Sequence, residues 1–194
     1  MDYYTLVRFA HIVGFILLGG GLLAVFVSEL RAYRTRDVRI FAEAARYTAI
    51  FYDALTLPGA VILALSGFLL IFEMGLGFFD EPWLVGMWGL FLFEFFEGNI
   101  VTRIQYRRTL RESVKALEQG RLTEEARGEA RTLLGQITHF LDIPLFLVIV
   151  YCGAIRPATW NHVVIAIVVA LAAALILTVT VPRLARRETG PEQE

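Results

Sequence analysis

The sequence has little of what identifies the common classes of soluble enzyme. Cys152 is its single cysteine, which excludes a disulfide within the chain, and no CxxC, CxxCH or paired-cysteine zinc motif is present. A nucleotide-binding glycine loop, the GxSxG nucleophile motif and the HExxH metalloprotease motif are missing too. Any functional chemistry must therefore come from residues outside these familiar motifs.

An excess of charge of one sign is missing as well. The 18 basic side chains, almost all of them arginine, nearly cancel the 19 acidic ones. Hydrophobic residues instead make up 57% of the 194 residues, and the mean hydropathy is +0.60. Both values exceed what a soluble domain carries. The composition excludes an ordinary soluble enzyme and indicates a protein of the lipid bilayer.

A helix needs about 20 apolar residues to cross a bilayer, and five stretches of about this length occur. They cover residues 6–28, 48–72, 83–103, 135–155 and 160–182. A membrane-spanning backbone must satisfy its hydrogen bonds internally, and the alternating segments of a barrel are not seen, so the stretches are predicted to be helices. The predicted fold is all-α: one membrane domain, residues 1–194, with five transmembrane helices.

The placement of the basic residues predicts the topology. They gather in every second connection, within residues 31–46, 103–131 and 183–187. The other connections carry acids or the single Arg156. By the positive-inside rule the basic connections face the cytoplasm, so the N-terminus lies outside and the C-terminus inside.

The longest polar connection, at about 104–134, is predicted to form a cytoplasmic helical hairpin. Its apolar residues follow a helical period that Gly120 interrupts, and Thr123 has the position of an N-cap before two glutamates. The connection suits either a docking surface or a charged continuation of the third membrane helix. Because acids are interleaved with its arginines, it lacks the basic stripe of a nucleic-acid-binding protein.

Polar residues within the apolar stretches are the main candidates for function, because each costs roughly 2.5–3.5 kcal/mol at the centre of a membrane helix on insertion scales. Counting about 1.5 Å per residue from the middle of each stretch sorts them into two levels. The inner level, towards the cytoplasmic side, contains Asp53, Glu97, His139 and Asp142, with Glu94 near the middle of the membrane and Glu29 at the inner rim.

Three roles remain open for this inner level. A spacing of three residues places Glu94 with Glu97, and His139 with Asp142, on one helix face each, as in the metal sites of helical bundles. Such an oxygen-rich set with one histidine suits Mn, Fe or Zn. Clustered acids also suit a proton or polar-substrate pathway. Alternatively, they form structural ion pairs with arginines such as Arg103.

The outer level contains His11, Met87 and Tyr151 at similar depth, with His162 slightly nearer the surface. A neutral imidazole that faces a bundle interior can ligate haem iron, which makes His11 a candidate ligand, and Met87 or His162 a candidate for the opposite axial position. Gly14 and the run 19–21 remove side chains near His11. These glycines would permit either a flat macrocycle or close packing of helices.

Several of these residues resemble a known group of proteins. The histidine-bearing first helix, a proline and a glycine in the second, and an Asp-Ile-Pro helix that ends in Arg-Pro resemble the CopD/HemJ-like group of bacterial membrane proteins. The resembling positions are residues 9–14, 20–22, 29–31, Pro58, Gly67, 141–144 and 156–157. The similarity covers about residues 5–157, and the whole chain resembles most an uncharacterised family of predicted integral membrane proteins within this group.

The resemblance implies a cytochrome-b-like four-helix core with an added C-terminal helix, in the bacterial inner membrane. HemJ-type members are haem-associated oxidases, and CopD-type members act in copper resistance. Carried over by motif, His11 becomes the candidate ligand of haem b, and Asp142 stands where the HemJ-type acid would. We therefore expect a haem-b-associated redox or electron-transfer protein, in the class of membrane oxidoreductases, with a membrane redox partner.

Two other interpretations of the sequence stay open. A non-redox transporter, metal-binding protein or accessory membrane subunit would use the inner level of carboxylates and histidine. A homo-oligomer would form through the small residues of the last stretch, such as Ala170 and Ala174, which permit close contact between helices.

Overall fold

The computed structural model describes residues 2–130 and 132–188, and within these ranges every regular element is helical. The elements are α1 (Tyr3–Arg34), α2 (Val38–Phe51), the π-helical η1 (Tyr52–Thr56), α3 (Leu57–Glu73), α4 (Pro82–Glu97), the π-helical η2 (Gly98–Thr102), α5 (Arg103–Glu118), α6 (Glu124–Ala130), α7 (Leu133–Ile155) and α8 (Trp160–Glu188). The all-α prediction is confirmed.

Five of the resulting rods are long and apolar enough to cross a membrane, as predicted. Two of them are composite, because α2, η1 and α3 form one rod, Val38–Glu73, and α4, η2 and α5 form another, Pro82–Glu118. Each predicted apolar stretch lies within one rod. α1 and the two composite rods extend well beyond the apolar stretches that they contain. Helical hydrogen bonding continues into the charged flanks, which a count of apolar residues does not detect.

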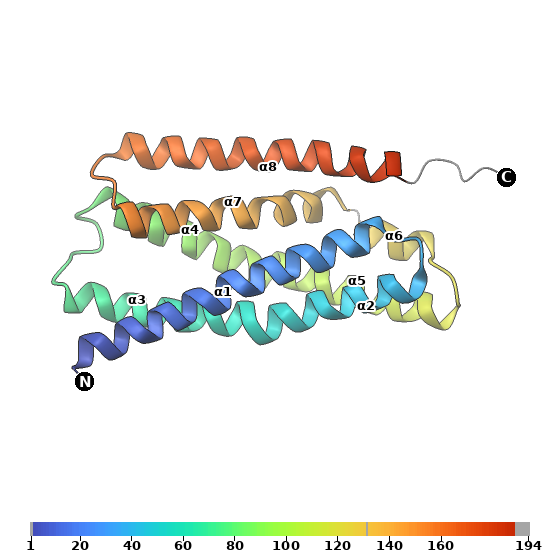
Figure 1. Cartoon of the computed structure of the whole chain (residues 1–194), viewed down its shortest axis with the longest axis horizontal. Helices are drawn as coiled ribbons and strands as arrows, with labels where there is room; N and C mark the ends of the chain where they lie inside the picture. The colour runs from blue at the N-terminus through green and yellow to red at the C-terminus, as the bar shows by residue number, and fades with distance from the viewer. Residues whose placement is uncertain (1, 131, 189–194) are drawn as a thin grey trace.

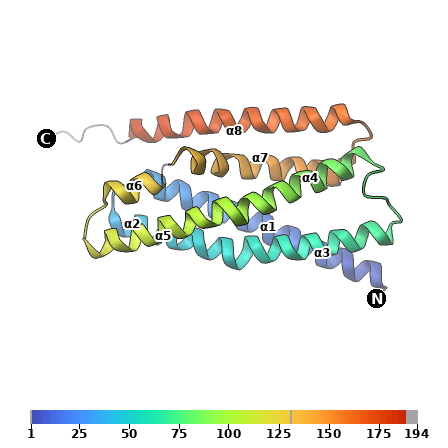
Figure 2. The ribbon, with the colours of Figure 1, turned by 180° about the vertical axis from the view of Figure 1, so that it is seen from behind.

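The rods lie roughly side by side, with α8 at the periphery (Figures 1 and 2). α1 packs against α2 and α3, α2 against α5, and α4 against α7, whereas α8 packs mainly against α7. Ala170 and Ala174 of α8 are buried within this bundle, so these small residues already serve packing inside the chain. We call the end with Tyr3 and the loops 74–81 and 156–159 the N-terminal end, and the opposite end, with α6, the hairpin end.

Glycines let α1 and the second rod approach closely. A Cβ atom at Gly14 would lie 2.7 Å from the backbone nitrogen of Leu63, and one at Gly21 would lie 2.7 Å from the backbone nitrogen of Thr56. No side chain larger than hydrogen fits at either position without moving backbone. Of the two roles open for these glycines, Gly14 and Gly21 serve helix packing.

The polar connection forms two helices at the hairpin end. α5 continues the third membrane rod to Glu118, Gly120 has a φ of +68°, and α6 follows. The hydroxyl of Thr123 accepts a hydrogen bond of 3.2 Å from the backbone N–H of Ala126, as predicted for an N-cap. Ala116 of α5 and Ala126 of α6 are fully buried in one apolar cluster with α1 and α2. The two helices thereby close this end of the bundle.

The π-helical segments η1 and η2 lie next to each other within the two composite rods. The hydroxyl of Tyr52 in η1 lies 2.9 Å from the position of a Cβ atom at Gly98 in η2. In η2, Thr102 donates a hydrogen bond of 2.9 Å to Glu97, five residues before it. A π-helical turn rotates the residues beyond it relative to an α-helix, and such turns occur frequently at functional sites.

Candidate functional site

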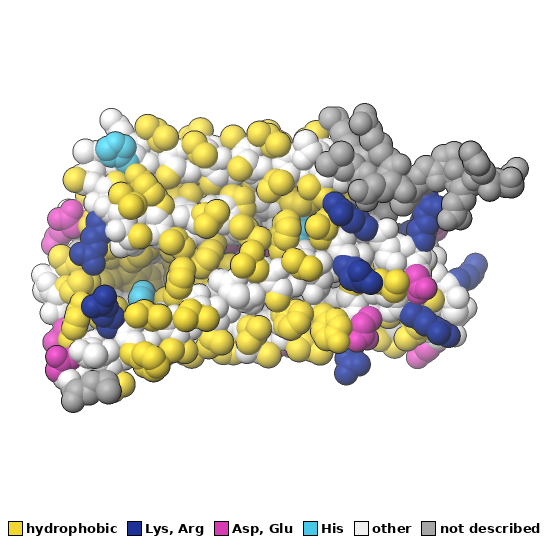
Figure 3. All heavy atoms as spheres, in the orientation of Figure 1, with side chains coloured by type: hydrophobic (Ala, Val, Ile, Leu, Met, Phe, Trp, Pro, Cys, Tyr) yellow, Lys and Arg dark blue, Asp and Glu magenta, His cyan; other side chains and the backbone are white. Residues whose placement is uncertain are grey.

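A large hollow opens near the N-terminal end, between α1, α3, α4 and α7. Its volume is about 620 Å³, and its walls are mainly apolar and aromatic, with His11 among them. Figure 3 shows this hollowed face, with arginine or lysine side chains beside its opening. Binding sites for small molecules and cofactors commonly have about 300–1,000 Å³ and such apolar walls. We call it the His11 cavity.

The ring of His11 is oriented by a serine of the neighbouring helix. Its Nδ1 lies 3.1 Å from the hydroxyl oxygen of Ser66, and that hydroxyl donates its own proton to the carbonyl of Ile62 at 2.6 Å. With the Ser66 proton directed to Ile62, this arrangement suits the tautomer in which Nδ1–H of His11 donates to Ser66 and Nε2 carries the free lone pair. A histidine ligand whose other nitrogen is held in this way is typical of metal and haem sites.

Two residues of α4 add polar and soft groups to the wall of the cavity. Met87 lines it, with its sulfur 3.3 Å from the position of a Cβ atom at Gly153. The indole N–H of Trp88, another lining residue, is buried and has no hydrogen-bond partner among the described residues. A buried donor without a partner costs free energy, and the absence of accessible surface on this nitrogen shows that it points away from the open cavity.

The second predicted histidine of this level lies elsewhere. His162 is exposed on α8, and its Nδ1 lies 3.1 Å from the hydroxyl of Thr159. It is not among the residues that line the His11 cavity. Of the two residues predicted to face His11, the structure therefore brings only Met87 to the same cavity.

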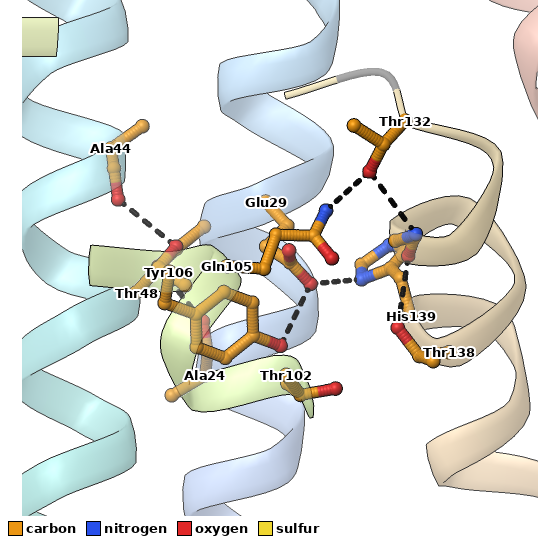
Figure 4. A network of polar contacts seen from close by, with 12 residues as sticks. Ala24, Glu29, Ala44, Thr48, Thr102, Gln105, Tyr106, Thr132, Thr138 and His139 are labelled. Atoms are coloured by element: carbon orange, nitrogen blue, oxygen red, sulfur yellow. Dashed lines mark hydrogen bonds and ion pairs between the residues drawn. The ribbon is translucent and has the colours of Figure 1, made fainter. Parts of the chain in front are cut away.

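The inner histidine takes part in a separate polar network towards the hairpin end (Figure 4). Nδ1 of His139 on α7 forms a very short contact with Oε2 of Glu29 on α1, and the hydroxyl of Tyr106 on α5 donates to the same oxygen at 3.2 Å. The imidazole also stacks on Phe26, with ring centroids 4.6 Å apart. This Glu29 network joins three helices, and a small cavity of about 40 Å³ borders it.

Three predicted acids meet in another small cavity, which we call the acidic chamber. Glu94 and Glu97 on α4 and Asp142 on α7 line this space of about 50 Å³. Tyr52 also lines it and contacts Tyr106 of the Glu29 network edge to face, at 5.6 Å between centroids. The chamber is large enough for water rather than for an organic substrate.

The acidic chamber lies directly behind the His11 cavity. Phe91, Phe146 and Ile149 line both spaces and thus form the wall between them. The outer and inner levels that the sequence separates are therefore neighbours in the bundle, divided by one apolar layer.

The fifth predicted member of the inner level, Asp53, lies apart from the others. It is partly exposed, and its carboxylate pairs with Arg103 at 2.9 Å and with Arg107 at 3.7 Å. For this residue the structure shows the ion pair that the sequence left open. Within residues 2–130 and 132–188, no three His, Cys, Asp or Glu side chains form a group that could hold a metal ion.

Sequence reasoning missed some residues of these sites and undervalued others. Ser66 gave no signal, because a hydroxyl that bonds to its own helix is common in membrane helices. The sequence predicts Glu29 at the inner rim, whereas α1 extends to Arg34 and brings Glu29 beside His139. The length of the polar flank after residue 28 was the signal that could have placed Glu29 inside the bundle.

Comparison with known proteins supports the membrane assignment. The model of one family, described as predicted integral membrane protein (DUF2269), matches residues 5–157. No curated protein and no solved structure matches the chain. The match covers most of the sequence, from the first turn of α1 to the end of α7, and so includes His11, the acidic chamber and the Glu29 network. The chain is therefore a member of this family of predicted integral membrane proteins.

Proposed function

We propose that this protein binds haem b in the His11 cavity and acts in electron transfer or a related redox reaction in the membrane. The observation that carries the proposal is the pairing of His11 with Ser66, which leaves Nε2 free to ligate iron at the wall of a large apolar cavity. The resemblance of the first helix to the CopD/HemJ-like group adds support to this choice.

The walls of the cavity fit such a cofactor. Its volume of about 620 Å³ suits a macrocycle, and Met87 of its wall is a candidate for a second iron ligand. Bound haem supplies one-electron chemistry at a potential that its axial ligands and surroundings set. The role of the chain is to hold the iron through His11 and to exclude water with its aromatic walls.

We also propose that the hairpin end faces the cytoplasm of a bacterial inner membrane. The basic residues concentrate in the connections at this end, which the positive-inside rule places in the cytoplasm. The His11 cavity then opens towards the outer face, where an extracytoplasmic redox partner could reach it. A reporter protein fused to the C-terminus should be active only on the cytoplasmic side.

The test is a titration of detergent-purified apoprotein with haem b, followed by the Soret band. The wild type should bind one haem saturably. Removal of a group that only supports a ligand costs about 10- to 100-fold in affinity, so His11→Ala, which removes the ligand itself, should cost more. His162→Ala is the matched control and should bind like the wild type, because His162 lies outside the cavity. Absence of saturable binding to the wild type, or equal binding by His11→Ala, would contradict the proposal.

A non-redox role is the second candidate, and the acidic chamber favours it. Three acids around a space of water size, next to the Glu29 network, suit transfer of protons or another small polar species. In liposomes with an imposed pH gradient, Glu97→Gln or Asp142→Asn should then abolish proton uptake that His11→Ala leaves intact. Proton uptake that is equal in all variants would remove this candidate.

A further inference from the structure

Two arginines stand at the rim of the His11 cavity and take no part in the haem ligation proposed above. Arg8 lies on α1, one helical turn before His11, and Arg156 follows the last residue of α7. Both line the cavity and both are exposed to its opening. Arg8 and Arg156 thus belong to segments that are far apart in the sequence but meet at one opening.

The backbone holds Arg156 in an unusual conformation. Its φ of 52° and ψ of 59° lie in the left-handed region, and no other non-glycine residue among those described has a positive φ. Glycine is the residue normally found at such a helix end, so an arginine here carries backbone strain. Its guanidinium lies over the ring of Trp83, 5.1 Å from the centroid. The left-handed turn and this stacking together fix the cation beside the cavity.

No described carboxylate neutralises the two positive charges. Among the described residues that line the His11 cavity, none is acidic. Within the part of the chain that the structure describes, no carboxylate comes within ion-pair distance of Arg8 or Arg156. Guanidinium groups bind carboxylates and phosphates through paired hydrogen bonds. An apolar cavity with two free guanidinium groups at its opening is complementary to an amphiphilic anion.

We propose that Arg8 and Arg156 form an anion clamp, which binds the carboxylates of a ligand whose apolar body fills the His11 cavity. This inference rests on the proposed function, because the ligand meant is haem b with its two propionates. The clamp sets the orientation of the macrocycle, with the carboxylates at the rim and the apolar edge directed towards the wall shared with the acidic chamber.

The clamp is tested with haem b and its dimethyl ester, in which both carboxylates are blocked. Arg8→Gln and Arg156→Gln should each lower the affinity for haem b by about 10- to 100-fold, as expected for a hydrogen bond between charged groups. Neither change should alter the affinity for the ester, which the wild type should bind more weakly than haem b. Arg121→Gln is the matched control, because Arg121 is an exposed arginine of the α5–α6 connection at the hairpin end.

An equal loss of affinity for haem b and for its ester, or no loss for either, would overturn the clamp while leaving haem binding established.

A second experiment, with a ligand that contains no iron, separates the two proposals. Binding of cis-parinaric acid and of its methyl ester is followed by fluorescence in the same variants. If the wild type binds no haem but binds the acid in an arginine-dependent way, the proposed function fails and the clamp stands for another amphiphilic carboxylate. If binding of neither haem b nor cis-parinaric acid depends on the arginines, the clamp is refuted. Unchanged elution and thermal unfolding confirm that the variants are folded.

Discussion

The hydroxyl of Ser66 on α3 holds Nδ1 of His11 on α1 at 3.1 Å, across the helix pair that the glycines bring together. The close approach of the two backbones and the orientation of the imidazole are thus parts of one arrangement. Packing between α1 and α3 brings Ser66 to the ring, and a Ser66 hydroxyl that donates to Ile62 favours the tautomer with the proton on Nδ1 of His11. The chemistry available at the cavity therefore depends on the fit of two helices.

Removal of the serine hydroxyl should weaken haem binding without unfolding the protein. We expect Ser66→Ala to lower haem affinity about 10- to 100-fold, since the ring of His11 loses its fixed orientation. Haem titration measures the loss. Ser113→Ala is the matched control, because Ser113 is buried at the hairpin end and bonds to its own helix at Leu110. An affinity equal to that of the control would show that Ser66 does not position His11.

A side chain at Gly67 should displace the imidazole directly. A Cβ atom there would lie 3.1 Å from Cε1 of His11, so the larger Gly67→Val must push the ring away. We expect a loss of at least about 10-fold in haem affinity, of the size seen when a ligand loses its support. Gly89→Val serves for comparison, because a Cβ atom at Gly89 would meet nothing within 4 Å. Equal effects of the two changes would argue against this placement of His11.

The glycines of α1 should differ sharply in their tolerance of alanine. Gly21→Ala places a Cβ atom 2.7 Å from backbone of η1 and should lower the free energy of unfolding by about 1–3 kcal/mol. Its neighbour Gly20 has nothing within 4 Å of its Cβ position, so Gly20→Ala should be neutral or stabilising by up to about 1 kcal/mol. Thermal unfolding in detergent distinguishes them. Similar behaviour of both variants would contradict the packing of α1 on the second rod.

The Glu29 network and the ion pairs of Asp53 should contribute unequally to stability. Glu29→Ala leaves both His139 and Tyr106 without their common partner, and the cost should be about 1–3 kcal/mol. Asp53→Ala breaks partly exposed pairs with Arg103 and Arg107, which should cost at most about 1 kcal/mol. Denaturation of both variants in one detergent gives the comparison. A larger loss for Asp53→Ala would reverse this ranking.

The fold could be predicted from the sequence to a large extent because apolar length, caps and glycine breaks are local signals. The break at Gly120 and the cap at Thr123 illustrate this. The site could be predicted only in part. His11 stands out as an imidazole in an apolar stretch, but its partner Ser66 lies 55 residues away, and only the packing of α1 on α3 brings them together. Arg156 indicated topology in the sequence, and its left-handed backbone appears only in the structure.

Depth along a helix sorts the polar residues into levels but does not predict which of them meet. Asp53 shares the inner level with the other acids, and the structure turns it outward to the arginines of α5. His11 belongs to the outer level, and only one apolar wall divides its cavity from the inner acids. Depth along a helix can be counted from sequence, but the direction of a side chain around the helix depends on the π-helical turns and the neighbouring helices.

The central claim is tested most directly by a dithionite-reduced minus oxidised visible spectrum of the protein purified from haem-supplied cells, beside the same spectrum of His11→Ala. We expect a Soret and α-band pair at near one haem per chain in the wild type, and its loss in His11→Ala while the variant stays folded. A colourless, folded wild-type protein, or an unchanged spectrum in His11→Ala, would contradict it.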